Sequence, residues 1–315
     1  MKRPNTCVNL IKAINQIDKS GDPVRFSRAM ANVIVGQILP DGVVKGGSSL
    51  MFRYGGEFTR YTRDMDTARV MGLADYKQKL EKIEIFSPPT FSGRSFMVQH
   101  LLHIQNLVTP EIWYNIRRFR RLVSPLGASG SGFGIFQPPP ESYVMIPFDI
   151  KLSYCGRSWQ TIRIEIGHNE IGDADEYEEY LPPDLAEAFE TLSFPCPAAL
   201  RVMRLPYQIA QKLHAVSEPG SERAHDLIDL QLIVRHSTLD FVEVRKTCVR
   251  LFEYRRKHAW APKIVAGDGW RKTYEDAYAT IVDASSVLPS VDDAVVWANE
   301  LVSKIDEVGN EVRGR

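Results

Sequence analysis

The sequence predicts a mixed α/β core followed by a helical C-terminal region, and three patterns support this order. Apolar residues recur at helical spacing over residues 1–35. Apolar and polar residues alternate on both sides of segment 155–158 ("CGRS"), as in a β-hairpin with one buried face. Beyond about residue 175, strand signals fade and helical patterns continue. We therefore expect a core with an N-terminal helical lead-in over residues 1–175 and a helical domain over residues 176–315.

Composition and charge narrow the class of protein. The chain has 315 residues, 44% hydrophobic and 25% charged, which is typical of a soluble protein with one large or two modest domains. Lysine plus arginine (39) equals aspartate plus glutamate (39), so a nucleic acid would have to be held by a local patch. No run approaches the roughly 18 apolar residues that span a bilayer, and a signal-peptide pattern is lacking, so we expect a cytoplasmic protein without a membrane partner. Four widely spaced cysteines without a C-x-x-C pair argue against a zinc ribbon.

The first strand of the core leads into a glycine turn. Segment 38–44 ("ILPDGVV") ends in a β-branched run, which indicates a strand entering the turn at Gly46 and Gly47. A helix follows, for which we expect Ser48 as the cap and the glycine pair 55–56 as the stop. The next strand carries two aspartates.

The rest of the core is predicted from the same signals. Segment 70–90 is polar and helical until two prolines break it, and segment 124–140 is a loop rich in glycine, serine and proline. The hairpin over residues 142–167 directs Ile162, Ile164 and Ile166 to one face.

The two aspartates form the first candidate site. Asp64 and Asp66 lie two residues apart on a strand, so both carboxylates project from one face. Two close negative charges persist most readily around a cation, and hard oxygen ligands suit Mg²⁺ with substrate phosphates. A third carboxylate is expected from the hairpin, where both Glu165 and Asp149 are candidates and we favour Glu165.

The glycine turn supplies the complementary chemistry. Backbone N–H groups of Gly46 and Gly47 have no Cβ to keep a phosphate away, and the N-terminus of the following helix attracts negative charge. Phosphate and metal would then meet at one place, which is the geometry of phosphoryl or nucleotidyl transfer.

A second candidate cluster lies on two helices predicted over residues 205–216 and 221–234. Asp226 and Asp229 sit three residues apart within a strongly apolar run, so they need cationic partners. Lys212 and Arg223 are the nearby candidates. A purely structural ion-pair network between the two helices is the alternative interpretation.

Four blocks in order resemble the AbiEii family of abortive-infection and toxin–antitoxin proteins. They are "VVKGGSSLMFRYG", "RYTRDMD", "IEIG", and "QKLHAV" with "RAHDLIDL". The resemblance covers most of the chain and implies a polymerase-β-like nucleotidyltransferase core with a mixed sheet, followed by helices. Two departures are His225 before Asp226, where the family often has a basic residue, and a long spacing between Ser48 and Asp64.

The resemblance implies roles for the residues at matching positions. Metal ligands would be Asp64, Asp66 and Glu165, with Lys212 and Asp226 completing the catalytic set. Nucleotide contacts would come from Lys45, Gly46, Gly47, Ser48, Arg60, Lys212, Arg223 and Asp229. It further implies a toxin that uses Mg²⁺ or Mn²⁺ to transfer a nucleotide from an NTP to RNA, with the 3′ acceptor end of tRNA as the expected target. A cognate antitoxin would restrain it.

Two basic segments are candidates for holding RNA. They are the run 117–121 ("RRFRR"), which includes an aromatic ring, and the run 245–257, although a solvated helix face explains either one. The glycine-rich segment 127–134 lacks the lysine and context of a P-loop, so we interpret it as a loop. Two other functions stay open: a non-catalytic nucleotide-binding module that acts through a partner, and a small-molecule nucleotidyltransferase of the aminoglycoside type.

Overall fold

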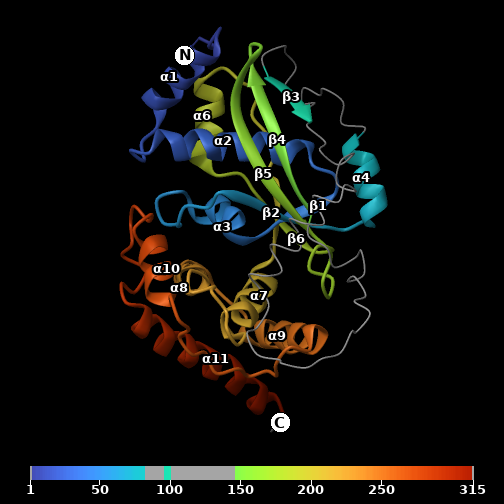
Figure 1. The fold of residues 1–315 in the computed structure, drawn as a ribbon, viewed down its shortest axis with the longest axis vertical. Helices are drawn as coiled ribbons and strands as arrows, with labels where there is room; N and C mark the ends of the chain where they lie inside the picture. Colours follow the sequence, from blue (N-terminus) through green and yellow to red (C-terminus); the bar gives the residue numbers. More distant parts are fainter. Residues whose placement is uncertain (1, 82–95, 101–145, 314–315) are drawn as a thin grey trace, which may run out of the picture.

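The computed structural model describes residues 2–81, 96–100 and 146–313. Its described strands form one seven-stranded sheet in the order β3-β4-β5-β2-β1-β7-β6 (Figure 1). β1 pairs with β7 and β2 with β5 in parallel, whereas the other neighbours are antiparallel, so the sheet is mixed as predicted. The strands are β1 (Gly42–Val44), β2 (Asp64–Arg69), β3 (Phe96–His100), β4 (Ile146–Tyr154), β5 (Arg157–Gly167), β6 (Tyr177–Tyr180) and β7 (Leu200–Met203).

Three helices bury one face of this sheet. α1 (Cys7–Ile17), α2 (Pro23–Ile38) and α6 (Pro183–Thr191) share a buried cluster with alternate side chains of β5, such as Ile162 and Ile164. The predicted hairpin is confirmed, because β4 and β5 are antiparallel and their inward residues alternate with outward ones. α4 (Leu73–Glu81) follows β2 as the polar helix expected there.

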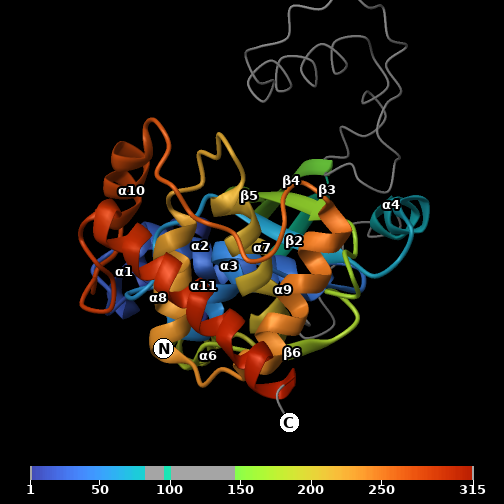
Figure 2. The same cartoon turned by 90° about the horizontal axis from the view of Figure 1, so that it is seen from below.

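The C-terminal helices form a second cluster below the sheet. They are α7 (Leu205–Ser217), α8 (Asp226–His236), α9 (Phe241–Arg255), α10 (Trp270–Tyr278) and α11 (Val291–Arg313). Figure 2 shows α11 running across α8 and α9, which it contacts. The segment α3 (Gly46–Tyr54) lies between the two parts, since Leu50 belongs to the helical cluster while Met51 and Phe52 belong to the sheet cluster. Among the described helices, none is long and apolar enough to cross a membrane.

The sheet extends past the domain boundary expected after residue 175. β6 and β7 both join it, and α6 packs in the first cluster with α1 and α2. The stretch around β6 gives little strand signal because it is acidic, yet an edge strand pairs on one side only and tolerates outward charges. Strand β7 is too short to show an alternating pattern. We therefore propose that the helical region begins near Arg204 rather than at residue 176.

The start of α3 also differs from the prediction. The helix begins at Gly46 with Lys45 as its N-cap residue, and Lys45 makes no side-chain capping bond. Ser48 therefore lies inside the helix, where it is buried, and its hydroxyl donates to the carbonyl oxygen of Asp64 over 3.1 Å. The glycine stop is confirmed, since Gly55 has a φ of 89° and its N–H donates to Met51.

Candidate active site

The paired aspartates of β2 lie beside a glutamate of β5. Asp64 and Asp66 flank Met65, which is fully buried in the sheet cluster, so both aspartates project from the opposite face. β2 and β5 are parallel, and their register pairs Asp66 with Glu165 and Asp64 with Arg163. Adjacent strands lie about 4.8 Å apart, so Asp66 and Glu165 are side-by-side neighbours on one face.

The same register places the two candidates for the third carboxylate at different distances from Asp66. Asp149 of β4 lies opposite Arg163 and is exposed, and Pro147 is the residue opposite Glu165. Asp149 is therefore separated from Asp66 by the whole of β5. Glu165, which the sequence analysis favoured, is the one beside Asp66.

Burial and mutual repulsion act on these carboxylates. Burial raises the pKa of Asp66, and the positive charges of Lys45, Arg223 and Lys212 oppose that rise. Burial also raises the pKa of Glu165, and the charges of Asp66 and Asp64 raise it further. A pair of carboxylates in this state is stabilised by binding a proton or a cation.

Their chemistry fits a hard divalent cation, because all the donors are carboxylate oxygens. Within the described ranges, however, no three His, Cys, Asp or Glu side chains already form a metal-binding group. The fit therefore rests on the type of donor and on the raised pKa values of Asp66 and Glu165.

The glycine turn contacts the aspartate strand directly. A Cβ on Gly46, whose φ is 63°, would lie 2.5 Å from Oδ2 of Asp66. The N–H of Lys45 donates to the carbonyl of Asp66 over 2.8 Å. The first turn of α3 has no side-chain cap, so its N–H groups are unsatisfied by any capping side chain and lie beside the Asp66 carboxylate that contacts Gly46. A residue other than glycine at position 46 would displace that carboxylate.

The second cluster is a network of three cations around two buried carboxylates. Lys212 of α7 donates to Oδ1 of Asp226 over 2.9 Å and to Oδ2 of Asp229 over 2.6 Å. Arg60, from the segment before β2, binds both oxygens of Asp229 at 3.0 and 2.9 Å. Arg223 donates from Nε to Asp226 over 2.8 Å. The network therefore joins the sheet part of the molecule to α7 and α8.

The network keeps its two carboxylates ionised. Burial alone would raise the pKa of Asp226, but Lys212 and Arg223 together outweigh it and hold that pKa below its usual range. For Asp229, Arg60 and Lys212 overcome the burial in the same way. Three positive charges face two negative ones, so the network has a net positive charge. Arg223 and Lys212 are close enough to Asp66 to lower its pKa.

The ion pairs of Lys212 with Asp226 and Asp229 limit how far its ammonium can move towards a nucleotide. Its side chain is only 5% exposed, and its ammonium is held by both carboxylates. An ion-pair network that links α7 and α8 is thus present, and the catalytic role of Lys212 stays a prediction. Arg223 is 53% exposed, which makes it the accessible cation of the group.

An acidic loop after β5 escaped the sequence analysis. Asp173 is fully buried, accepts from Gln211 over 2.5 Å and from the backbone of Glu170 over 2.8 Å, and burial raises its pKa to about 7. Glu170 is bound by both ends of the Arg255 guanidinium, at 3.1 and 2.5 Å. Lys45 lies over Gly167 at the start of this loop. The dense run 167–175 ("GHNEIGDAD"), which starts at the end of β5, was the signal that could have found it.

The structure describes only one of the two basic segments that were proposed to hold RNA. Segment 117–121 lies outside the described residues, as does the glycine-rich segment 127–134. On α9 and just beyond it, Arg245 pairs with Asp306 at 3.0 Å and Lys257 with Glu218 at 2.6 Å, in addition to the pair between Arg255 and Glu170. Three cations of this run are therefore engaged in ion pairs, whereas Lys246, Arg250 and Arg256 are exposed, and the RNA-binding role of the run stays a prediction.

A mixed sheet with paired carboxylates beside a helix N-terminus that has no side-chain cap is the arrangement expected of the nucleotidyltransferase class of enzyme. The family model described as "Nucleotidyl transferase AbiEii toxin, Type IV TA system" matches residues 28–296. The chain belongs to this family of nucleotidyltransferase toxins.

Other comparisons are more distant. No curated protein sequence matches the chain. A crystal structure from H. pylori assigned as a nucleotidyltransferase is similar at 11% identity and a TM-score of 0.41, covering 90% of this chain and 95% of that one. MenT4, a nucleotidyltransferase toxin from Mycobacterium tuberculosis, is similar at 13% identity and a TM-score of 0.43, covering 92% and 98%. Both of these structural similarities are weak, so the assignment of the chain to the nucleotidyltransferase toxins rests on the family model.

Proposed function

We propose that this toxin transfers a nucleoside monophosphate from an NTP to RNA, at the 3′ acceptor end of a tRNA, with Mg²⁺ or Mn²⁺ as cofactor. The observation that carries this proposal is the register that sets Glu165 beside Asp66, with Asp64 on the same face of the sheet. It supports a site that is completed when a divalent cation arrives with its triphosphate.

In this proposal Asp64, Asp66 and Glu165 hold the metal, which when bound would neutralise charge on the triphosphate. Backbone N–H groups at the start of α3, from Gly46, Gly47 and Ser48, would receive the phosphates. In the alternative role, the two aspartates hold the metal and Glu165 is the general base that takes the proton from the attacking 3′ hydroxyl of the RNA, a role that its raised pKa suits.

The buried network is proposed to act in two ways. Lys212, held by Asp226 and Asp229, contributes positive potential without needing to leave its partners. Arg223 uses Nε for Asp226, so its other N–H groups are available to a phosphate. Arg60 is a positioning residue, since it holds Asp229 and lies against Gly47.

A transfer assay tests this function. The purified protein is incubated with each labelled NTP, Mg²⁺ and total RNA, beside the variants Asp66→Ala and Asp66→Asn. We expect label in RNA of tRNA size only with the intact protein and only with a divalent cation. Label on an aminoglycoside in place of RNA would identify a small-molecule transferase, and NTP binding without any transfer would identify a binding module.

The type IV toxin–antitoxin description of the family implies a cognate antitoxin. We propose that this partner is encoded next to the toxin and acts in the cytoplasm. Co-expression with the neighbouring gene tests this, because growth should be restored only when the antitoxin is present.

A further inference from the structure

The ammonium group of Lys45 lies on the carboxylate face of the sheet, at the end of β5. Gly167 follows Glu165 by two residues in that strand, so the space above Gly167 belongs to the face that carries Glu165 and Asp66. A Cβ on Gly167 would lie 3.0 Å from Nζ of Lys45 and 3.7 Å from its Cε. The missing side chain at position 167 therefore makes room for the lysine beside the proposed metal ligands.

Unlike the ammonium of Lys212, this one is not paired with a carboxylate. Among the described residues, no ion pair or hydrogen bond joins the Lys45 side chain to an Asp or Glu. Burial raises the pKa of both Asp66 and Asp173, and in each case the charge of Lys45 is the largest effect that opposes the rise. Lys45 thus lies between the metal site and the acidic loop without being bound by either.

The acidic loop, residues 167–175, is anchored to the C-terminal helices. The fully buried Asp173 accepts a hydrogen bond from Gln211 of α7 over 2.5 Å. Arg250 of α9 donates to the carbonyl of Ile171 over 2.8 Å. The place of the loop, which starts at Gly167, is therefore set by α7 and α9.

Glu170 is the carboxylate of this loop that stays ionised. Burial alone would raise its pKa, but Arg255, which binds both of its oxygens, outweighs the burial and holds that pKa below its usual range. The charge of Lys45 acts in the same direction. Because Arg255 already occupies both oxygens, Glu170 attracts the lysine without forming an ion pair with it.

The opposite attraction on Lys45 comes from Asp66. An ammonium paired with Asp66 would compete with a metal ion, since both bind the same carboxylate oxygens. Attraction towards the loop keeps the ammonium over Gly167 and leaves Asp66 open. Lys45 is also the N-cap residue of α3, so its charge adds to that of a helix N-terminus.

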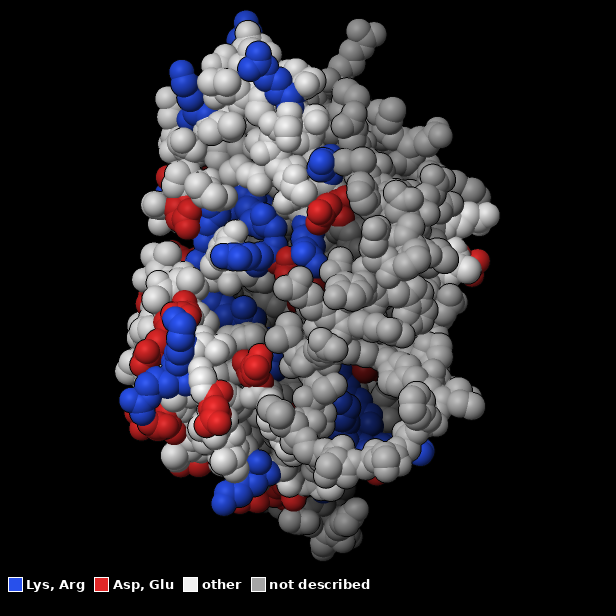
Figure 3. All heavy atoms as spheres, in the orientation of Figure 1, with Lys and Arg blue, Asp and Glu red and all other residues white. Residues whose placement is uncertain are grey.

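The distribution of charge favours this face for a triphosphate. Figure 3 shows Lys and Arg side chains gathered at the level of α3 and β2, between the sheet and the C-terminal helices. A polyanion is attracted to such a region. The positive charge of Lys45 therefore lies in a part of the surface where phosphates are favoured.

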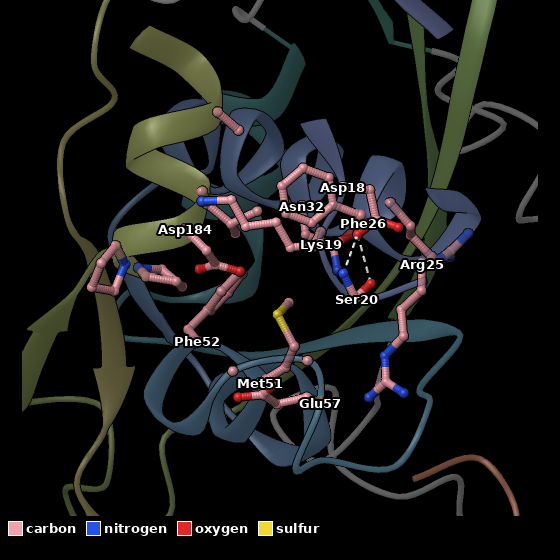
Figure 4. Close-up of a pocket in the computed structure, with 18 of the residues that line it drawn as sticks. Asp18, Lys19, Ser20, Arg25, Phe26, Asn32, Met51, Phe52, Glu57 and Asp184 are labelled. Carbon is pink, nitrogen blue, oxygen red and sulfur yellow. Dashed lines mark hydrogen bonds between the residues drawn. The ribbon is translucent and has the colours of Figure 1, made fainter. Parts of the chain in front are cut away.

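The largest cavity of the described residues is a different place. It has a volume of about 580 Å³ and lies among α1, α2 and α6, which cover the sheet face that buries Met65 (Figure 4). Asp18, Glu57 and Asp184 lie around it. These carboxylates disfavour a triphosphate there, and the cavity serves below as a competing site in the test.

We propose that Glu170 is a positioning residue of the active site, which holds the Lys45 ammonium over Gly167, where it binds the phosphates of the NTP and leaves Asp66 to the metal. This rests on the proposed function for the NTP and the metal, and it adds the part of the molecule that places the phosphate-binding cation. Gln211 and Arg255 support that role by fixing the loop from α7 and α9.

The test uses matched pairs of variants, of which the first concerns the carboxylate. Glu170→Gln removes a negative charge that is paired with Arg255 of α9. Asp306→Asn removes one that is paired with Arg245 of the same helix, and it is the control. Each variant leaves one arginine of α9 without its charged partner, so an effect of the released arginine alone should appear in both.

Two further pairs concern the glycine and the lysine. Gly167→Ala places a methyl group 3.0 Å from the ammonium of Lys45 and changes no charge, whereas Gly72→Ala adds one on the surface, where the nearest atom is 3.6 Å away. Lys45→Gln removes the cation itself, and Lys19→Gln removes an exposed lysine that lines the cavity of Figure 4. Thermal unfolding of every variant shows that it is folded.

Nucleotide binding without RNA gives the first readout. Calorimetric titration in Mg²⁺ measures Kd for a non-hydrolysable analogue of each NTP. We expect Lys45→Gln to raise Kd by about tenfold or more, as the loss of a charged phosphate contact does. Glu170→Gln and Gly167→Ala should raise it by about three- to tenfold. The three controls should match the wild type.

A double variant separates positioning from a general effect on the fold. In the Lys45→Gln background, Glu170→Gln should raise Kd no further, because the lysine through which it acts is gone. An equal factor in both backgrounds, or an equal effect of Asp306→Asn, would overturn the proposal. So would a loss of binding in Lys19→Gln with none in Lys45→Gln, which would place the nucleotide in the cavity.

Metal binding gives a second readout that needs no nucleotide. Electron paramagnetic resonance measures free Mn²⁺ during a titration of the protein. Glu170→Gln should bind Mn²⁺ at least about threefold more weakly than the wild type, because Lys45 then pairs with Asp66. Adding Lys45→Gln to that variant should restore the affinity. Equal Mn²⁺ binding in Glu170→Gln and the wild type would contradict the proposal. If NTP and Mn²⁺ bind as expected but no nucleotide reaches RNA, the proposed function fails while the role of Glu170 stands.

Discussion

The metal-binding role proposed for Asp66 needs an ionised carboxylate, which lowers the stability of the folded protein. Burial raises its pKa, so the ionised carboxylate is unfavourable in the folded protein at neutral pH. We expect Asp66→Asn to lower nucleotide transfer by at least about 100-fold, as the loss of a group that binds the catalytic metal does. Without divalent cation, the same variant should unfold at a higher temperature than the wild type. Transfer assays and thermal unfolding in EDTA check both parts. A variant that loses stability but keeps its activity would contradict the proposed role.

Asp173 gives a prediction about pH. Its folded pKa is about 7, well above the ordinary value of an aspartate. The folded state therefore holds a proton that the unfolded state releases, so this contribution to stability is present at low pH and is lost as pH rises to 7. Between about pH 4 and pH 7 we expect Asp173→Asn to remove part of this decline, at most about 1.4 kcal/mol per pH unit.

Urea unfolding of the wild type and Asp173→Asn at several pH values measures this difference. The amide keeps one oxygen, so it can accept only one of the two bonds that Asp173 accepts from Gln211 and from the backbone of Glu170. That loss does not vary with pH, so the slope of stability against pH, not its absolute value, reports the proton. Asp75→Asn, on the exposed part of α4, is a suitable control and should follow the wild type. Parallel curves for Asp173→Asn and the wild type would refute the assignment of the proton to Asp173.

At the scale of elements, α7 and α8 are held together by the buried network. Lys212→Met keeps the volume of the side chain but leaves Asp226 and Asp229 with one cation fewer in a buried place. Removing one partner from a buried ion pair typically costs about 3–5 kcal/mol. We expect a loss of this size in the free energy of unfolding, measured with urea.

Arg223 provides the contrast within the same network. Its side chain is half exposed, so solvent screens its pair with Asp226, and Arg223→Gln should cost no more than about 1 kcal/mol. If Arg223 is the phosphate contact, this variant raises KM for the NTP while leaving the fold intact. Equal losses of stability in Lys212→Met and Arg223→Gln would show that the two cations do not differ in the way we describe.

The elements also show which parts of the fold are visible in the sequence. The β4–β5 hairpin was predictable because its core-facing isoleucines alternate with Arg163 and Glu165 over a long strand. β6 and β7 were missed, since one is an acidic edge strand and the other has only four residues. Ser48 was assigned as a cap from its residue type, yet α3 begins two residues earlier, at Gly46, where the backbone turns out of β1.

The candidate active site was likewise predictable from the sequence only in part. The spacing of Asp64 and Asp66 fixes their common face, because it depends only on strand geometry. The choice of Glu165 over Asp149 depends on the register between β2 and β5, which a sequence alone does not specify. The pairing of Arg60 with Asp229 spans 169 residues and follows from how the two parts pack. Local patterns thus predict single elements, whereas the contacts between them need the fold.

At the scale of the whole molecule, α3 is the element that connects the two buried clusters. Leu50 is fully buried among the C-terminal helices, while its neighbours Met51 and Phe52 are buried against the sheet. Arg53 adds a link by donating to the carbonyl of Met203 over 2.8 Å. We therefore expect the described parts of the chain to unfold in one transition.

Leu50→Ala tests this coupling. The deletion of a buried leucine side chain costs about 2–5 kcal/mol, because it loses apolar burial and leaves a cavity. Since α3 joins both clusters, hydrogen exchange should speed up to the same extent in β5 and in α8, although only α8 belongs to the cluster that loses the contact. Leu251→Ala, within the helical cluster alone, is the matched comparison and should also affect both if the transition is single. Faster hydrogen exchange confined to the helices in both variants would mean that the two parts unfold independently. The bound substrate, rather than the fold, would then hold together the site between them.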